Sequence, residues 1–125
     1  MSSKIVLTAT GVWIGLIGAA WLVMPAIFSN FWGVAPDDNF TYMGQRDGAL
    51  MLGLAVTAWV ARNAPITQAR RALMIGSLVA LALLTGLSAY GALALGLNTW
   101  GPVVAESLFV MGFVWVLFIK PEPVV

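Results

Sequence analysis

The side chains with the greatest capacity for chemistry in this sequence are Arg46, Asp47, Tyr90 and Glu106. Three of them carry charge within or beside strongly apolar segments, where a charge is costly unless it is paired or reaches a polar interface. A guanidinium and a carboxylate form a strong ion pair, and a tyrosine hydroxyl can add a hydrogen bond. These residue types therefore fit two roles. One is an ion pair that joins two helices, and the other is a polar pocket for a headgroup, an ion or a small polar solute.

Arg46 and Glu106 are the expected pair, because both lie near the same end of their apolar runs. Arg46 and Asp47 open one run, and Glu106 lies about one helical turn, roughly 6 Å, into another. Asp47 is rotated by about 100° from Arg46 around a helix axis, so we expect it to point elsewhere. Tyr90 and Asn98 lie at a similar depth and are expected to join the cluster.

Two residue types are missing from the chain, and their absence limits its chemistry. The sequence contains no Cys and no His. A thiolate nucleophile, a disulfide, an imidazole acid or base and a His-ligated metal are thereby excluded. The sequence also has no glycine-rich phosphate loop and no metal-ligand spacing. We therefore expect a non-enzymatic protein with no cofactor of its own.

The composition identifies the environment that these residues must occupy. Of the 125 residues, 61% are hydrophobic and 9% are charged, against about 45–50% and 25% in typical soluble domains. So few charged side chains cannot cover the surface of a small soluble protein. The composition excludes a soluble enzyme, a disordered chain and a nucleic-acid binder, and it predicts a membrane protein.

Four apolar runs in the sequence are long enough to cross a bilayer, which takes about 20 residues. Backbone polar groups in hydrocarbon must be satisfied within their own segment, so each run is expected to be a helix. The prediction is an all-α fold, a polytopic membrane protein whose four transmembrane helices form an antiparallel bundle. Residues 1–125 would make a single domain, with helices at about 5–28, 44–61, 72–97 and 103–119.

The distribution of basic residues predicts the orientation of the chain. With four spans, the two termini and the second connection lie on one side of the membrane. Five of the six basic residues are on that side, namely Lys4, Arg62, Arg70, Arg71 and Lys120. Basic residues favour cytoplasmic loops, so we expect an integral inner (plasma) membrane protein with both termini in the cytoplasm.

Small residues recur at helical spacing in the first two runs, for example Gly11 with Gly15 and Gly44 with Gly48. Such residues allow helix backbones to approach closely in a membrane. They predict packing within the bundle, or a first-helix face kept for another subunit. Residues 28–35 are expected to form a short interfacial segment, and Trp13 and Trp21 to contact a partner or lipid.

The run from Arg46, with the sequence Arg-Asp-Gly-Ala-Leu-Met-Leu-Gly, follows Pro25 and Trp32-Gly33 and precedes a basic loop. In this layout the chain resembles the small bacterial four-helix membrane proteins grouped around DoxX. The resemblance implies a four-helix inner-membrane protein, and some members serve as membrane subunits of oxidoreductase complexes. It carries no catalytic residue onto this chain.

Three functions are compatible with the sequence. The first is a non-enzymatic accessory subunit that packs against a larger membrane complex or lipid. The second is an oligomeric transport protein for a small solute or ion, with Arg46, Tyr90 and Glu106 lining an outward-facing vestibule. The third is a membrane enzyme or quinone-site subunit that uses Glu106 and Tyr90. The expected partners are membrane lipid and a larger complex or a second copy of the chain, without nucleic acid.

Overall fold

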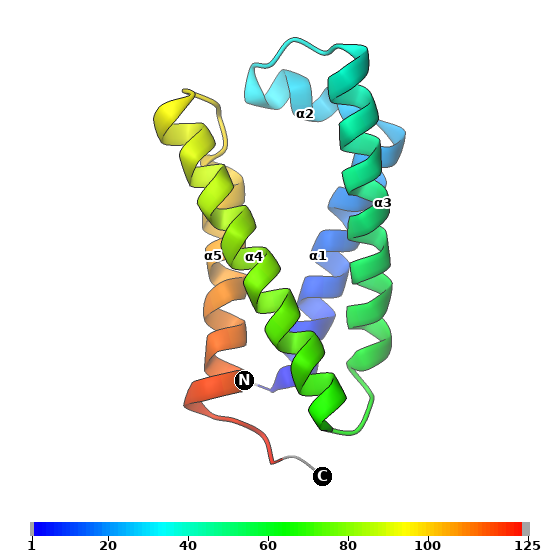
Figure 1. Cartoon of the computed structure of the whole chain (residues 1–125), viewed down its shortest axis with the longest axis vertical. Coiled ribbons are helices and arrows are strands. Elements are labelled where there is room, and N and C mark those ends of the chain that lie inside the picture. The colour runs from blue at the N-terminus through cyan, green and yellow to red at the C-terminus, as the bar shows by residue number, and fades with distance from the viewer. Residues whose placement is uncertain (1, 124–125) are drawn as a thin grey trace.

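The computed structural model describes residues 2–123, and within this range the chain consists of helices and short connections, with no strand (Figure 1). The all-α prediction is therefore confirmed. The elements are α1 (Ser3–Val23), α2 (Pro25–Trp32), α3 (Asp38–Ala61), α4 (Gln68–Ala94), α5 (Trp100–Val114) and the π-helix η1 (Trp115–Ile119). Both ends of the described chain lie at one end of the molecule, here named the terminal end. The opposite end, which carries α2, is the α2 end.

Three helical segments are long and apolar enough to cross a membrane: Ser3–Val23, Gln68–Ala94 and Trp100–Ile119. They indicate a membrane protein. The fourth long helix, α3, has 24 residues but carries Gln45, Arg46 and Asp47 within its length, and these polar side chains lower its hydropathy. The four-span bundle expected from the sequence is therefore not confirmed.

The first helix predicted from the sequence, at residues 5–28, extends farther than the helix in the structure. The helix ends at Val23, because Pro25 has no N–H to continue the ladder and Met24 leaves the helical region at φ −139° and ψ 57°. The chain turns there and begins α2, which lies across the end of the molecule opposite the termini (Figure 1). Gln45 satisfies a carbonyl near this break, since its side-chain nitrogen donates a hydrogen bond to the oxygen of Leu22 at 3.3 Å.

Two helices begin earlier than the sequence predicted because polar residues cap them. The Asp37 side chain accepts a hydrogen bond from the Phe40 N–H at 2.6 Å, so α3 begins at Asp38 and not near residue 44. The Thr67 hydroxyl accepts from the Arg70 N–H at 3.3 Å and begins α4 at Gln68. The fourth predicted helix also begins early, at residue 100, but without a side-chain cap, and α4 ends before 97.

Helices α1 and α3 form one closely packed antiparallel pair. A Cβ added to Gly48 would lie 2.7 Å from the Gly18 carbonyl oxygen, and one added to Gly18 would lie 2.9 Å from the Gly48 oxygen. Farther along the pair, a Cβ on Gly11 would lie 3.2 Å from the oxygen of Ala55. The small-residue face of the first helix is thus filled by α3. Packing within the chain is the first of the two expectations for this face, and the contacts agree with it; the alternative, a face kept for another subunit, is wrong.

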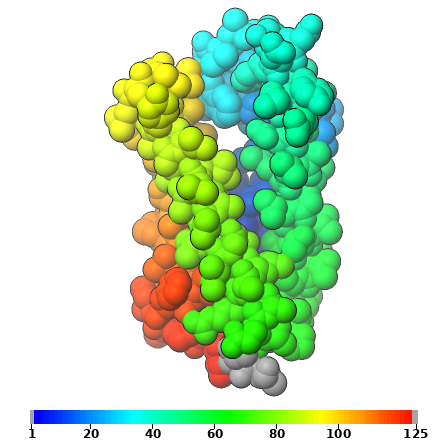
Figure 2. Space-filling model, viewed as in Figure 1, coloured from blue at the N-terminus to red at the C-terminus, as the bar shows by residue number. Residues whose placement is uncertain are grey.

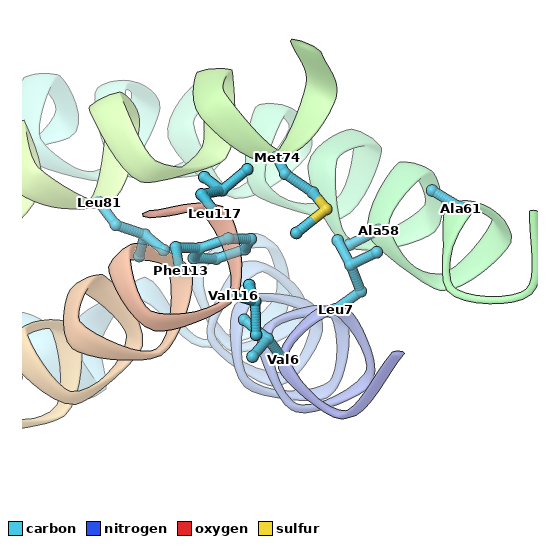
Figure 3. Close-up of a cluster of buried hydrophobic side chains, with 9 residues drawn as sticks. All are labelled: Val6, Leu7, Ala58, Ala61, Met74, Leu81, Phe113, Val116 and Leu117. Carbon is cyan, nitrogen blue, oxygen red and sulfur yellow. The ribbon is translucent and has the colours of Figure 1, made fainter. Parts of the chain in front are cut away.

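Helices α4 and α5 form the second pair, and the two pairs meet at the terminal end and separate toward the α2 end (Figure 1). A buried apolar core joins them near the terminal end (Figure 3). Its members come from α1, α3, α4, α5 and η1, and they are Val6, Leu7, Ala58, Ala61, Met74, Leu81, Phe113, Val116 and Leu117. Phe113 and Leu7 are fully buried at 0% exposure. The core therefore fixes the pairs against each other at one end.

A polar network closes the same end. Arg70 is buried, and its Nη1 donates to the Ala64 carbonyl at 2.7 Å while its Nη2 donates to the Ser3 hydroxyl at 2.8 Å. The Ser3 hydroxyl in turn donates to the Glu122 carboxylate, which also accepts from the Ser3 N–H at 3.1 Å. The first helix, the α3–α4 connection and the C-terminal segment are thereby tied together.

Replacing Gly48 with Ala is expected to lower the free energy of unfolding by about 1–3 kcal/mol, because the new methyl forces two backbones apart. Gly53→Ala is the matched control on the same helix, since nothing lies within 4 Å of a Cβ at that position. The control should be neutral or stabilising by up to about 1 kcal/mol. Thermal unfolding in detergent measures both, and equal midpoints for the two variants would contradict the close approach.

Arg70→Gln is expected to destabilise the chain by about 2–4 kcal/mol, because charge-assisted hydrogen bonds are lost and their acceptors stay buried. Lys120→Gln removes the same charge from the same end, but Lys120 is exposed, so its effect should stay within about 0.5 kcal/mol. Denaturation of both variants checks this difference. A loss of the same size in both would assign the effect to net charge and not to the network.

Candidate functional site

A cavity of about 460 Å³ separates the two helix pairs toward the α2 end. Figure 2 shows an opening there, between α4 and the corner where α2 meets α3. Its walls are mostly aromatic and aliphatic, and they are formed by Trp13, Ile14, Ile17, Trp21, Phe28, Phe31, Trp32, Asp47, Met51, Leu81, Leu84, Ser88, Gly101, Pro102 and Glu106. Leu81 also belongs to the buried core, so the core forms the floor of this cavity.

Four aromatic rings form a cluster beneath α2, and three of them, Trp21, Phe28 and Trp32, line the cavity. Trp21 stacks on Phe28 with ring centroids 4.2 Å apart and planes 11° apart. Trp32 and Phe40 complete the group, with centroids 5.4 and 5.5 Å from that of Trp21. The break at Pro25 makes this possible, because it folds Phe28 and Trp32 of α2 back over Trp21 of α1. Such pairs contribute about 0.5–1.5 kcal/mol each beyond the area they bury.

Trp21 takes its place because Gly44 has no side chain. The indole lies against the backbone of α3 at Gly44, where an added Cβ would overlap the ring. Trp21 is 7% exposed and still contributes to the cavity wall. The glycines of α3 therefore serve two purposes: Gly48 lets the helices approach, and Gly44 seats the ring that lines the site.

Two carboxylates face the cavity from opposite pairs. Asp47 comes from α3, in the first pair, and Glu106 comes from α5, in the second. The Glu106 carboxylate accepts a hydrogen bond from the Ser88 hydroxyl of α4 at 3.1 Å. Among the lining residues there is no Lys or Arg. The site thus combines an apolar wall with two acidic groups and one hydroxyl.

The structure places the residues expected from the sequence in two different environments. Asp47 and Glu106 line the cavity, whereas Arg46 and Tyr90 do not. Arg46 lies on the outer side of α3 with its guanidinium carbon 5.9 Å from the Tyr42 ring centroid. Tyr90 is 58% exposed on α4. Within residues 2–123 no ion pair joins Arg46 to Glu106, so the expected pairing is wrong.

Helical spacing in α3 explains this division. The residues that pack toward α1 and the cavity, Gly44, Asp47, Gly48 and Met51, recur at intervals of three and four and therefore share one face. Tyr42, Arg46 and Leu50 recur at intervals of four on the outer face, and all three are exposed. The glycine spacing was a signal in the sequence that Asp47, and not Arg46, faces inward.

The sequence reasoning missed several residues of the site. Ser88 was not selected as a partner of Glu106, although α4 and α5 are adjacent antiparallel helices. Its backbone is held by Thr99, whose hydroxyl donates to the Ser88 carbonyl at 2.6 Å. Asn98 does not join the acidic cluster, since its side chain donates to the Phe31 carbonyl at 3.3 Å and links the α4–α5 connection to α2. Nothing in residue type alone distinguishes these contacts.

The groups that line the cavity define what it offers to a ligand. Across residues 2–123, no group of three or more acidic, His or Cys side chains is placed to hold a metal ion. The walls offer apolar contact, aromatic faces and two carboxyl groups. A small molecule with an apolar body and a polar group fits that combination.

The comparisons with known proteins add no relative: no family model, no curated protein and no solved structure matches the chain.

Trp21→Ala is expected to lower the free energy of unfolding by about 3–5 kcal/mol, because the indole is buried and contacts three other rings. Trp100→Ala is the control, as Trp100 lies near the same end but is 52% exposed and should cost about 1 kcal/mol or less. Chemical or thermal unfolding in detergent measures the difference. If both variants lose equal stability, the ring cluster does not stabilise the α2 end.

Proposed function

We propose that the chain is a non-enzymatic integral membrane subunit that holds a small amphipathic molecule between its two helix pairs. The observation that carries this proposal is the cavity of about 460 Å³, walled mainly by aromatic and aliphatic side chains. Small-molecule sites are typically concave and mostly apolar, with a few polar groups that orient the ligand. Here the polar groups are Asp47, Ser88 and Glu106.

In this proposal α3 is the fourth span. Its 24 residues extend about 36 Å at 1.5 Å per residue, against a hydrocarbon core of about 30 Å. Its packing against α1 at Gly11, Gly18 and Gly48 supports a position beside that span. Asp47 faces the cavity instead of lipid, and Arg46 is near enough to the helix end to reach the interface with its long side chain.

The proposed location is the inner (plasma) membrane, with both termini in the cytoplasm. Support comes from the basic residues. Five of the six belong to the termini, the α3–α4 connection and the first turn of α4, at the terminal end, and the sixth is Arg46, in the half of α3 nearer the α2 end. Two tryptophans accompany these charges. The Arg62 guanidinium carbon lies 3.4 Å from the Trp59 ring centroid, and the Lys120 ammonium lies 5.9 Å from that of Trp115. Such pairs suit a membrane–water interface.

The proposed partners are membrane lipid and either a larger membrane complex or a second copy of the chain. The outer faces support this, because large apolar side chains such as Leu50, Val60 and Leu93 are 70%, 69% and 75% exposed. Contiguous apolar surface of this kind is covered in the functional state. The resemblance to DoxX-like proteins agrees with a subunit role and stays a prediction.

The test is a gentle purification from native membranes through a C-terminal tag, with mass spectrometry of the proteins and small molecules that remain bound. Leu84→Trp fills the cavity from α4, and Leu87→Trp, one turn away and exposed, is the matched control. We expect a bound molecule with the wild type and with Leu87→Trp, and its loss with Leu84→Trp. Retention in Leu84→Trp, or no bound molecule in the wild type, would refute the proposed site.

A second candidate is an oligomeric transport protein for a small solute or ion, favoured by the presence of Asp47 and Glu106 at the cavity near the α2 end. The same purification separates the two. A stoichiometric larger protein supports the accessory role, whereas a pure homo-oligomer directs attention to flux measurements on Asp47→Asn and Glu106→Gln in proteoliposomes.

A further inference from the structure

Two carboxyl groups line the cavity, and no basic side chain of the lining residues in the described chain accompanies them. Asp47 and Glu106 contribute a carboxylate from each helix pair. Arg46, adjacent to Asp47, lies beside Tyr42 on the outer face. Asp47 is exposed and Glu106 is half-buried, so the cost of placing a carboxylate in apolar surroundings without an opposite charge or hydrogen-bond donors falls on Glu106. Ser88 supplies one donor, to Glu106.

Aromatic rings in the same wall favour the same sign of charge in a ligand. Trp13, Trp21, Phe28, Phe31 and Trp32 line the cavity, and the stacked rings of Trp21 and Phe28 lie 4.2 Å apart. The face of an aromatic ring attracts cations, and the attraction is stronger where water is excluded. Recognition of organic ammonium groups by aromatic side chains depends on this interaction.

We infer that the occupant of this cavity is a hydrophobic organic cation, an ammonium or similar group attached to an apolar body. The inference rests on the proposed function and adds the charge and class of its ligand. The cationic group lies between Asp47 and Glu106, and the apolar body extends toward Leu81 and Leu84, where the wall is aliphatic. An anion would find no charged donor, since no Lys or Arg lines the wall and the Ser88 hydroxyl already donates to Glu106; the other side-chain donors there are the neutral indole N–H groups of the tryptophans.

Two kinds of molecule combine a cationic group with an apolar body in this way: a lipid with an amine headgroup and a free amphipathic amine. Both place a cationic group near the polar α2 end and an apolar part deeper between the pairs. They differ in whether the molecule is a constituent of the membrane, so the composition of the purified material distinguishes them.

The experiment compares two probes of nearly equal shape and different charge. Benzyltrimethylammonium is the cation, and neopentylbenzene is its uncharged isostere, with carbon in place of nitrogen. Binding to the full chain is measured in dodecyl maltoside, an uncharged detergent, through tryptophan fluorescence. The variants are the double substitution Asp47→Asn with Glu106→Gln and, as the matched control, Asp38→Asn, an exposed carboxylate in the first turn of α3 outside the cavity.

We expect the wild type and Asp38→Asn to bind the cation at least about tenfold more tightly than the neutral probe. The double variant should lose this preference while it still binds the neutral probe, which also shows that it is folded. Equal affinity for both probes in the wild type overturns the inference, as does a preference that survives in the double variant. If neither probe binds the wild type, the proposed function fails together with the inference.

Lipid analysis of the same preparations assigns the source. Enrichment of an amine-headgroup lipid with the wild type but not with the double variant identifies a lipid ligand. Binding of benzyltrimethylammonium without such enrichment identifies a free cation.

Discussion

The close approach of α1 and α3 is the constraint on which the rest of this structure depends. Lipid gives helices no hydrophobic reason to associate, so contact between them relies on backbone proximity and side-chain fit. Gly18 and Gly48 allow that proximity, since a methyl on either would meet the other's carbonyl oxygen within 3 Å. With the helices this close, Trp21 lies on Gly44, α2 folds back over Trp21, and Asp47 turns inward. The position of the cavity wall therefore depends on the glycines at the contact between α1 and α3.

The helical content and the membrane character could be predicted from composition and run length, because they reflect the sum of many residues. The ends of the helices depend on single residues and were less well predicted. Pro25 ends α1 by removing one donor, and Asp37 begins α3 through one hydrogen bond to the Phe40 N–H. A continuous apolar run conceals the first effect, and a polar loop conceals the second, even though Pro and Asp are recognised as helix signals.

The candidate site was predicted in part, since Asp47 and Glu106 line the cavity while Arg46 and Tyr90 lie outside it. Depth along a helix can be estimated by counting residues, and that estimate correctly placed residues near the start of the second and fourth apolar runs at a similar depth. The direction of a side chain around the helix is harder to predict, because adjacent residues differ by about 100°. Opposite charge favoured Arg46 as the partner of Glu106, but the glycine face of α3 decides the rotation. Ser88 depends on the register between α4 and α5, which turn residues near Gly96 and Thr99 determine.

The unequal joining of the two helix pairs has a mechanical consequence. The core around Phe113 and the network of Arg70, Ser3 and Glu122 hold the pairs at the terminal end, while at the α2 end a hydrogen bond from Asn98 to Phe31 joins them. The two helix pairs are therefore held together more extensively at the terminal end, which is the pivot for any rotation of one pair relative to the other. Helix α4, with 27 residues, is about 40 Å long, so a rotation of roughly 10° at the pivot displaces its far end by about 7 Å. A change in the packing of Phe113 is therefore expected to alter the separation of the helix pairs at the opposite end of the molecule.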